Sequence, residues 1–83
     1  MTDAALAIVR AVHEAGGRAL VVGGWVRDRI MGRPSKDVDI EVYGLPAERL
    51  RNVLARLGPV NVVGESFTVY KVGDVDVSLP RRD

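Results

Sequence analysis

The feature that most constrains the fold is a valine-rich run that ends in two glycines and is followed at short range by two aspartates. The run is Val21-Val22-Gly23-Gly24-Trp25-Val26-Arg27-Asp28, and Lys36-Asp37-Val38-Asp39-Ile40 comes next. Valines before paired glycines and a short amphipathic segment predict a strand, a tight turn and the N-terminus of a helix. Such a turn lets backbone N–H groups and the positive helix end meet an anion, typically phosphate.

The two aspartates lie in a β-branched run. Side chains two apart on a strand point to the same face, so Asp37 and Asp39 would present both carboxylates together. Asp76 lies in a later run of the same kind and could join them from a neighbouring strand. Carboxylates placed in this way suit one or two Mg²⁺ ions, which clamp the attacking and leaving oxygens of a phosphoryl displacement. A phosphate cradle beside paired carboxylates indicates a nucleotide-handling site.

The whole pattern predicts an α+β fold, a small mixed β-sheet with helices on one face and the acids on the opposite face. Helical spacing predicts helices over residues 3–15 and 25–31, and a third that runs from Pro46, at its first helical position, to Leu57. Leu6 and Leu57 are among the expected core residues. Strands are predicted over residues 18–22, 37–43, 60–63, 67–72 and 75–79, with Gly73-Asp74 as a two-residue hairpin turn.

Length and composition predict one domain, residues 1–83. The chain is 47% hydrophobic and 28% charged, which is ordinary for a folded domain. Its net charge of +1 gives no strong field for a long polyanion. The absence of cysteine excludes disulfides and thiolate zinc sites. The sequence shows no targeting signal and no membrane-spanning run, so we expect a cytoplasmic protein without a membrane partner.

Each candidate residue also has a purely structural explanation. Strand aspartates often only face solvent, and paired glycines can serve a tight turn alone. Arg27 is poorly placed for the helix dipole, which favours an anionic partner, although an ion pair with Asp28 would also explain it. Lys36 could hold a phosphate or neutralise Asp37. The combination of the glycine turn with the aspartates is more specific than either part.

At these residues the sequence resembles a known family. The segments from Val21 to Asp28 and from Gly32 to Ile40 look like the head-domain signature of class II tRNA nucleotidyltransferases and bacterial poly(A) polymerases. These enzymes belong to the polymerase β-like nucleotidyltransferase superfamily, whose palm fold the chain would share. The segment from Asp74 to Arg81 resembles the strand that carries the third carboxylate of that family.

The resemblance implies a role for each matching residue. Asp37, Asp39 and Asp76 would be the catalytic acids that bind Mg²⁺. Gly23 and Gly24 would contact the triphosphate through their backbone, and Arg27 would contact the nucleotide. The implied reaction transfers a nucleoside monophosphate from ATP or CTP to the 3′-hydroxyl of an RNA, expected to be tRNA, without a template and with release of pyrophosphate.

The helical neck, body and tail that select the base and hold the tRNA in this family have no counterpart in the sequence. An isolated catalytic head is therefore expected, with self-association through apolar surface that those regions would cover. Two alternatives stay open: a minimal nucleotidyltransferase that modifies another acceptor, and a module that binds nucleotide or Mg²⁺ without turnover. A sugar-nucleotide glycosyltransferase also uses Asp-x-Asp, but such enzymes usually need a far longer chain.

Overall fold

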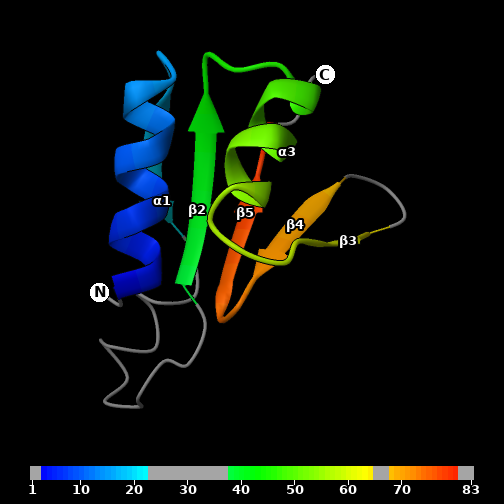
Figure 1. Cartoon of the computed structure of the whole chain (residues 1–83). Coiled ribbons are helices and arrows are strands. Elements are labelled where there is room, and N and C mark those ends of the chain that lie inside the picture. Colours follow the sequence, from blue (N-terminus) through cyan, green and yellow to red (C-terminus); the bar gives the residue numbers. More distant parts are fainter. Residues whose placement is uncertain (1–2, 23–37, 65–67, 81–83) are drawn as a thin grey trace.

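The computed structural model describes residues 3–22, 38–64 and 68–80, which form two helices and five strands (Figure 1). In chain order these are α1 (Asp3–Glu14), β1 (Arg18–Val22), β2 (Val38–Tyr43), α3 (Ala47–Ala55), β3 (Asn61–Val63), β4 (Val69–Val72) and β5 (Val75–Ser78). Each lies within two residues of its predicted bounds. The helix predicted over residues 25–31 lies outside the described residues.

The strands form one mixed sheet in the order β1-β2-β5-β4-β3. Three of the four pairings are antiparallel, and β2 pairs with β5 in parallel. Parallel neighbours cannot be joined by a tight turn, so the chain crosses over through α3, β3 and β4 before it returns as β5. The predicted hairpin is confirmed: Gly73 has a φ of 60°, and the turn pairs Val72 with Val75.

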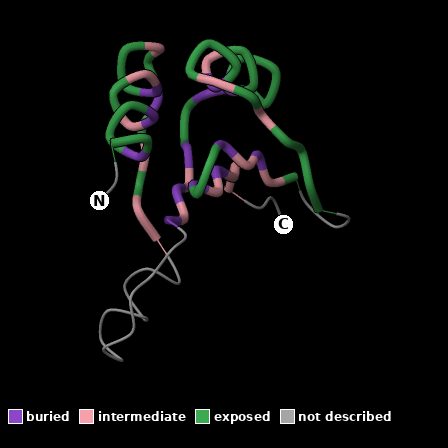
Figure 2. The backbone as a smooth tube through the Cα atoms, turned by 60° about the horizontal axis from the view of Figure 1, so that its bottom comes forward, coloured by how far each residue is buried: buried purple, intermediate pink, exposed green. Residues whose placement is uncertain are grey.

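Both described helices pack on the same face of the sheet (Figures 1 and 2). Helix α1 contacts β1, β2 and α3. The buried residues between the helices and the sheet form one core: Ala5, Ile8, Val12, Val38, Ile40, Val42, Leu45, Leu50, Leu54, Tyr70, Val72, Val75 and Val77. The predicted α+β arrangement, a small mixed sheet with helices on one face, is therefore confirmed.

Two glycines end α1 and bring the chain back to the sheet. Gly16 has a φ of 93°, a left-handed conformation that glycine adopts without strain. The N–H of Gly16 donates to the carbonyl of His13 at 3.0 Å, and the N–H of Gly17 donates to the carbonyl of Val12 at 2.9 Å, which closes the helix end. Gly17 is also packed tightly, because a Cβ there would lie 2.7 Å from Cγ of Leu45.

Pro46 precedes α3 as its N-cap residue, so its prediction as the first helical residue was wrong by one position. It has a ψ of 157°, and its carbonyl accepts the N–H of Leu50 at 3.0 Å. This is the usual arrangement of an N-cap: an extended backbone whose carbonyl accepts the first bond of the helix. Proline suits this position because it needs no donor of its own.

Two leucines that the helical pattern placed in the core are exposed. Leu6 is 43% exposed because it lies about 100° around α1 from Ala5, away from the buried stripe of that helix. Leu57 is 41% exposed because α3 ends at Ala55, so the chain has turned away from the helix axis before it reaches Leu57. Neither described helix is long and apolar enough to span a membrane.

The contrast between Leu54 and Leu57 gives a direct test of where α3 stops contributing to the core. Leu54 is fully buried, so we expect Leu54→Ala to lower the free energy of unfolding by about 2–5 kcal/mol. Leu57→Ala removes the same atoms from an exposed site and should cost less than about 1 kcal/mol. Urea unfolding followed by circular dichroism measures both. Equal losses would place Leu57 in the core, as the sequence pattern predicted.

Candidate functional site

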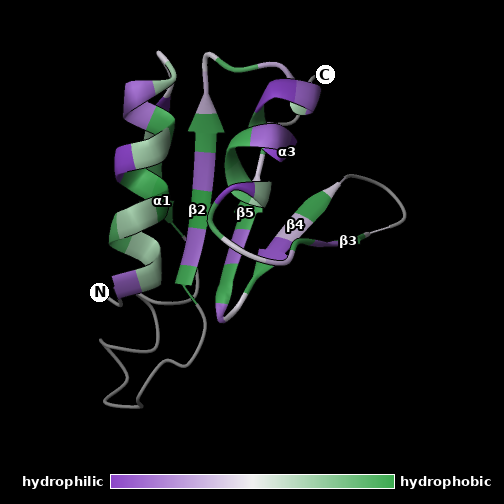
Figure 3. Ribbon diagram, viewed as in Figure 1, coloured by the Kyte–Doolittle hydropathy of each residue, from purple (hydrophilic) through white to green (hydrophobic). Residues whose placement is uncertain are grey.

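Strand β2 carries its acids on the face that no described helix covers. Val38, Ile40 and Val42 are buried beneath the helices, and Asp39 and Glu41 alternate with them. Figure 3 shows this alternation along the ribbon of β2. Because successive side chains of a strand point to opposite faces, the buried valines and isoleucine force both acids onto the open face. The predicted orientation of Asp39 is confirmed.

Strand β5 places a second carboxylate beside the first. Asp76 lies between the buried Val75 and Val77 and is the register partner of Asp39 in the parallel pairing. Neighbouring strands are about 4.8 Å apart, so the two carboxylates project side by side from the open face. Residues 39 and 76 therefore meet as the sequence predicted, although 36 residues of chain separate them.

The same row of the sheet continues to a lysine. Lys71 on β4 is the register partner of Asp76, and its Nζ lies 3.1 Å from Oδ1 of Asp76. The contact is an ion pair and not a well-directed hydrogen bond, because this buried oxygen accepts none from the atoms that the structure describes. We call the paired residues Asp39, Asp76 and Lys71 the carboxylate row.

Lys71 is a site residue that the sequence analysis missed, yet a signal for it was present. The predicted two-residue turn at Gly73-Asp74 fixes the pairing of the strands on either side of it. Counting outward from that turn pairs residue 72 with residue 75 and then Lys71 with Asp76. The lysine could therefore have been placed beside the third carboxylate from the hairpin alone.

Glu41 and Tyr43 form a separate contact farther along β2. The hydroxyl of Tyr43 donates a hydrogen bond to Oε1 of Glu41, its neighbour on the same face of the strand. This hydrogen bond, together with smaller effects of desolvation and of the Glu41 charge, raises the pKa of Tyr43. Glu41 is thus engaged with the tyrosine, in the next row of the sheet from Asp39.

The remaining predicted site residues lie outside the described part of the chain: Gly23, Gly24, Arg27, Lys36 and Asp37. Their assignment as nucleotide-binding residues and as a metal ligand stays a prediction. Their chain position is informative, because residues 23–37 join β1 to β2. The register partner of Asp39 on β1 is Val22, directly before Gly23, so this connection starts and ends beside the carboxylate row.

The donor set of the row fits a hard divalent cation. Asp39 and Asp76 offer carboxylate oxygens, the ligands that Mg²⁺ takes in proteins, and Mg²⁺ sites commonly use only one or two carboxylates. Within residues 3–22, 38–64 and 68–80, no group of three histidine, cysteine, aspartate or glutamate side chains is arranged to hold a metal. Asp37, the predicted third ligand, falls outside those ranges.

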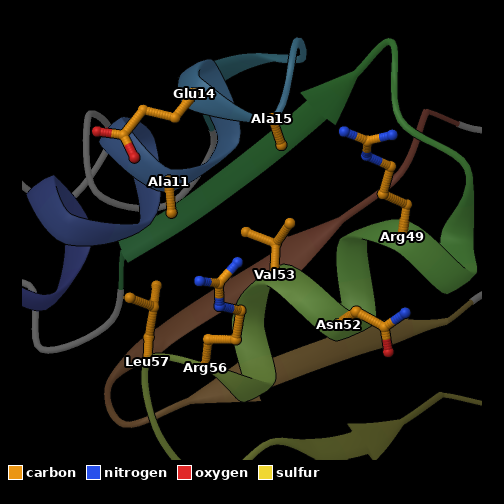
Figure 4. A pocket seen from close by; sticks show the side chains of 8 residues that line it. All are labelled: Ala11, Glu14, Ala15, Arg49, Asn52, Val53, Arg56 and Leu57. Carbon is orange, nitrogen blue, oxygen red and sulfur yellow. The ribbon is translucent and has the colours of Figure 1, made fainter.

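A groove lies on the helix-covered side of the sheet. It lies between α1 and α3, has a volume of about 620 Å³, and includes Glu14 on one wall and Arg49 and Arg56 on the other (Figure 4). Another hollow of about 710 Å³ lies against Leu45, Pro46 and Leu79. Neither is lined by a residue of the carboxylate row, so the candidate site rests on the paired carboxylates and not on a cavity.

Comparison with known proteins identifies the family to which this fold belongs. Residues 19–79 match the sequence model of the poly(A) polymerase head domain. A CCA-adding enzyme of Geobacillus thermodenitrificans is 42% identical over 74 residues, which cover 82% of this chain and 18% of that enzyme. A CCA-adding enzyme of Streptococcus pyogenes is 50% identical over 87 residues, covering 93% of this chain and 22% of that enzyme.

Solved structures of similar proteins share the fold of this chain. A crystal structure of a tRNA nucleotidyltransferase complexed with a primer tRNA and an incoming ATP analog has a TM-score of 0.62 and 36% identity, and the match covers 90% of this chain and 23% of that one. A tRNA-processing enzyme in an apo form has a TM-score of 0.61 and 35% identity, and the match covers 90% of this chain and 21% of that one. The chain thus spans about one fifth of the length of the relatives it matches.

The hydrogen bond between Tyr43 and Glu41 makes a testable prediction about pH. The bond needs a protonated phenol, so it persists below the ordinary tyrosine pKa and is lost only as the pH rises through the raised value. Glu41→Gln removes the charge and weakens the acceptor, and we expect it to lower the ionisation midpoint of Tyr43 toward the ordinary value. An NMR titration of the Tyr43 ring measures the midpoint. Glu48→Gln, on α3, is the control, and an unchanged midpoint in Glu41→Gln would contradict the contact.

Proposed function

Because the chain belongs to the poly(A) polymerase head-domain family over residues 19–79, we propose that residues 1–83 form the catalytic head of a nucleotidyltransferase. The proposed reaction transfers a nucleoside monophosphate from ATP or CTP to the 3′-hydroxyl of a tRNA in the cytoplasm. Relatives described as CCA-adding enzymes support tRNA as the acceptor, and the related complex with a primer tRNA and an ATP analog supports ATP as a donor. The observation that carries the proposal is the register pairing of Asp39 with Asp76 on the open face of the sheet.

Asp39 and Asp76, with Asp37 next to them in sequence, would hold Mg²⁺ in this proposal. When bound, Mg²⁺ neutralises phosphate charge and favours in-line displacement at the phosphorus that is attacked. The chain's own contribution is to position these ligands. The buried neighbours of Asp39 and Asp76 fix the two backbones, so the carboxylates keep their spacing before any substrate binds.

The connection between β1 and β2 would supply the phosphate contacts. Gly23 and Gly24 directly follow β1, and Lys36 precedes β2 by two residues. In this proposal the glycine backbone N–H groups and the side chains of Arg27 and Lys36 bind the triphosphate. Both ends of the connection flank Asp39, which would bring the bound phosphates within reach of the carboxylates.

Self-association is proposed from the two edges of the sheet. On the edge strand β3, Val62 is 51% exposed and Val63 is 44% exposed, and on the edge strand β1, Leu20 is 53% exposed. Edge strands with exposed apolar side chains offer backbone and surface for pairing with another chain. Both edges therefore favour contacts between copies of the chain.

The substitution Asp39→Asn tests the metal site. Wild type held at ten times the dissociation constant of Mg²⁺ with nucleoside triphosphate should be stabilised by about 1.4 kcal/mol. For a domain of this size this corresponds to a rise in melting temperature of about 4–8 °C. Asp39→Asn should lose most of this rise and any transfer of label from α-labelled nucleotide to tRNA, because one ligand oxygen is replaced by an amide. Without ligand its stability should be unchanged or slightly raised, because the repulsion between Asp39 and Asp76 falls.

Glu41→Gln is the matched control, since Glu41 lies on the same strand and face but outside the carboxylate row. It should keep the ligand-induced rise. A full rise in Asp39→Asn would place the metal elsewhere, and unfolding of that variant without ligand would make Asp39 a structural residue. A normal rise in wild type without transfer of label would favour a nucleotide-binding module, and transfer to an acceptor other than tRNA would favour a minimal nucleotidyltransferase.

The edge of the sheet gives a separate test. Val62→Lys adds a charge to β3, which should weaken pairing between copies of the chain. Sedimentation velocity over a range of protein concentrations should show association of wild type and a shift of the variant toward monomer. The surface substitution Glu48→Gln serves as the control and should associate like wild type. Wild type that stays monomeric at every concentration would refute self-association.

A further inference from the structure

Lys71 forms an ion pair with one oxygen of Asp76, a carboxylate that is proposed to bind metal. Its Nζ lies 3.1 Å from Oδ1 of Asp76, and Oδ1 is buried although the Asp76 side chain as a whole is 27% exposed. The exposed surface of this side chain must therefore belong to its other atoms, which include Oδ2. One oxygen of Asp76 faces the lysine, and the other is the one available to a ligand on the open face.

The backbone around Lys71 keeps it in this place. Lys71 alternates with Tyr70 and Val72, which are 5% and 8% exposed and pack in the core beneath the sheet. The two-residue turn at Gly73-Asp74 fixes the register that pairs Lys71 with Asp76. The lysine is thus presented to Asp76 from a strand that cannot shift without opening the core.

We propose that Lys71 is a positioning residue that restricts Asp76 to one-oxygen ligation of a divalent cation and thereby favours Mg²⁺ over Ca²⁺. This inference rests on the proposed function, because it takes the carboxylate row as the metal site. Mg²⁺ is small and octahedral, and one oxygen from each of a few carboxylates satisfies it. Ca²⁺ takes six to eight oxygens and often binds both oxygens of one carboxylate. While the ammonium of Lys71 is paired with Oδ1 of Asp76, Ca²⁺ loses a ligand oxygen that it would otherwise bind. Mg²⁺ needs only the other oxygen and loses nothing.

The positive charge of Lys71 has a second, nonselective effect. It weakens the binding of every cation at the row, because an ion pair must compete with the metal for the same carboxylate. This pair is partly exposed, with 42% of the lysine side chain accessible, so its effect on an affinity is limited to about fivefold. Charge alone would change the affinities for Mg²⁺ and Ca²⁺ alike. Only the position of the ammonium on Oδ1 predicts a change in their ratio.

The test is a calorimetric titration of the 83-residue chain with MgCl₂ and separately with CaCl₂. Lys71→Met removes the ammonium and keeps most of the side-chain length. From the loss of the charge alone, we expect both cations to bind up to about fivefold more tightly. Ca²⁺ should gain about threefold more than Mg²⁺, because both oxygens of Asp76 become available to it. Lys71→Arg restores a cation at the same position and should keep the wild-type ratio.

Arg18→Met is the matched control, because it also removes one exposed positive charge but lies on β1, paired with Tyr43 and away from Asp76. It should leave the ratio of the two dissociation constants unchanged. If Lys71→Met does not fold, Lys71→Thr gives the same test with a residue that suits a strand. An unchanged ratio in the lysine variant would overturn the role of Lys71 alone. A wild-type chain that binds neither cation would overturn the proposed metal site and this inference with it.

Discussion

The parallel pairing of β2 with β5 is the interaction on which the rest of the structure depends. It is the one parallel contact in the described sheet, and it sets Asp39 directly beside Asp76. The N–H of Val38 donates to the carbonyl of Asp74 at 3.1 Å, so the start of β2 is tied to the hairpin turn between β4 and β5. The hairpin turn that pairs Lys71 with Asp76 is therefore also bonded to the residue before Asp39, which fixes the position of Asp39 along β5. The registers of β5 with β2 and with β4 therefore determine together the geometry of all three charged side chains.

The core residues and the site residues alternate along the same strands and lie on opposite faces of the sheet. Val38, Ile40, Val75 and Val77 are almost fully buried, and each acid of the row lies between two of them. A slip of one residue would carry the acids into the core and the valines into solvent, so hydrophobic burial strongly opposes it. The burial that stabilises the sheet thus also keeps like charges close together. Lys71 offsets part of the repulsion that this proximity creates.

Local patterns in the sequence predicted most of the fold, because local signals determine most of it. Strict alternation located β2, and Gly73-Asp74 located the hairpin that pairs Lys71 with Asp76. The sequence could not distinguish the buried Leu54 from the exposed Leu57, because both fit the same helical spacing. What separates them is that α3 ends at Ala55, between the two leucines. The close packing of Gly17 against Leu45 is likewise a contact between distant segments that no local pattern encodes. The alternating runs suggested that Asp76 could join Asp39 from a neighbouring strand, and the resemblance to a family implied the same, but the strand order with its crossover is not encoded in any short stretch.

The crossover has a consequence for how the chain folds. In the part of the chain that the structure describes, the sheet consists of two antiparallel units, β1 with β2 and β3 with β4 and β5, which pair only between β2 and β5. Each unit can form from contacts close in sequence, whereas their junction requires closure of a loop that contains α3, β3 and β4. We expect the junction to form late in folding, after β5 has emerged during synthesis. The carboxylates lie side by side across that junction, so they come together only in a chain that has completed its fold.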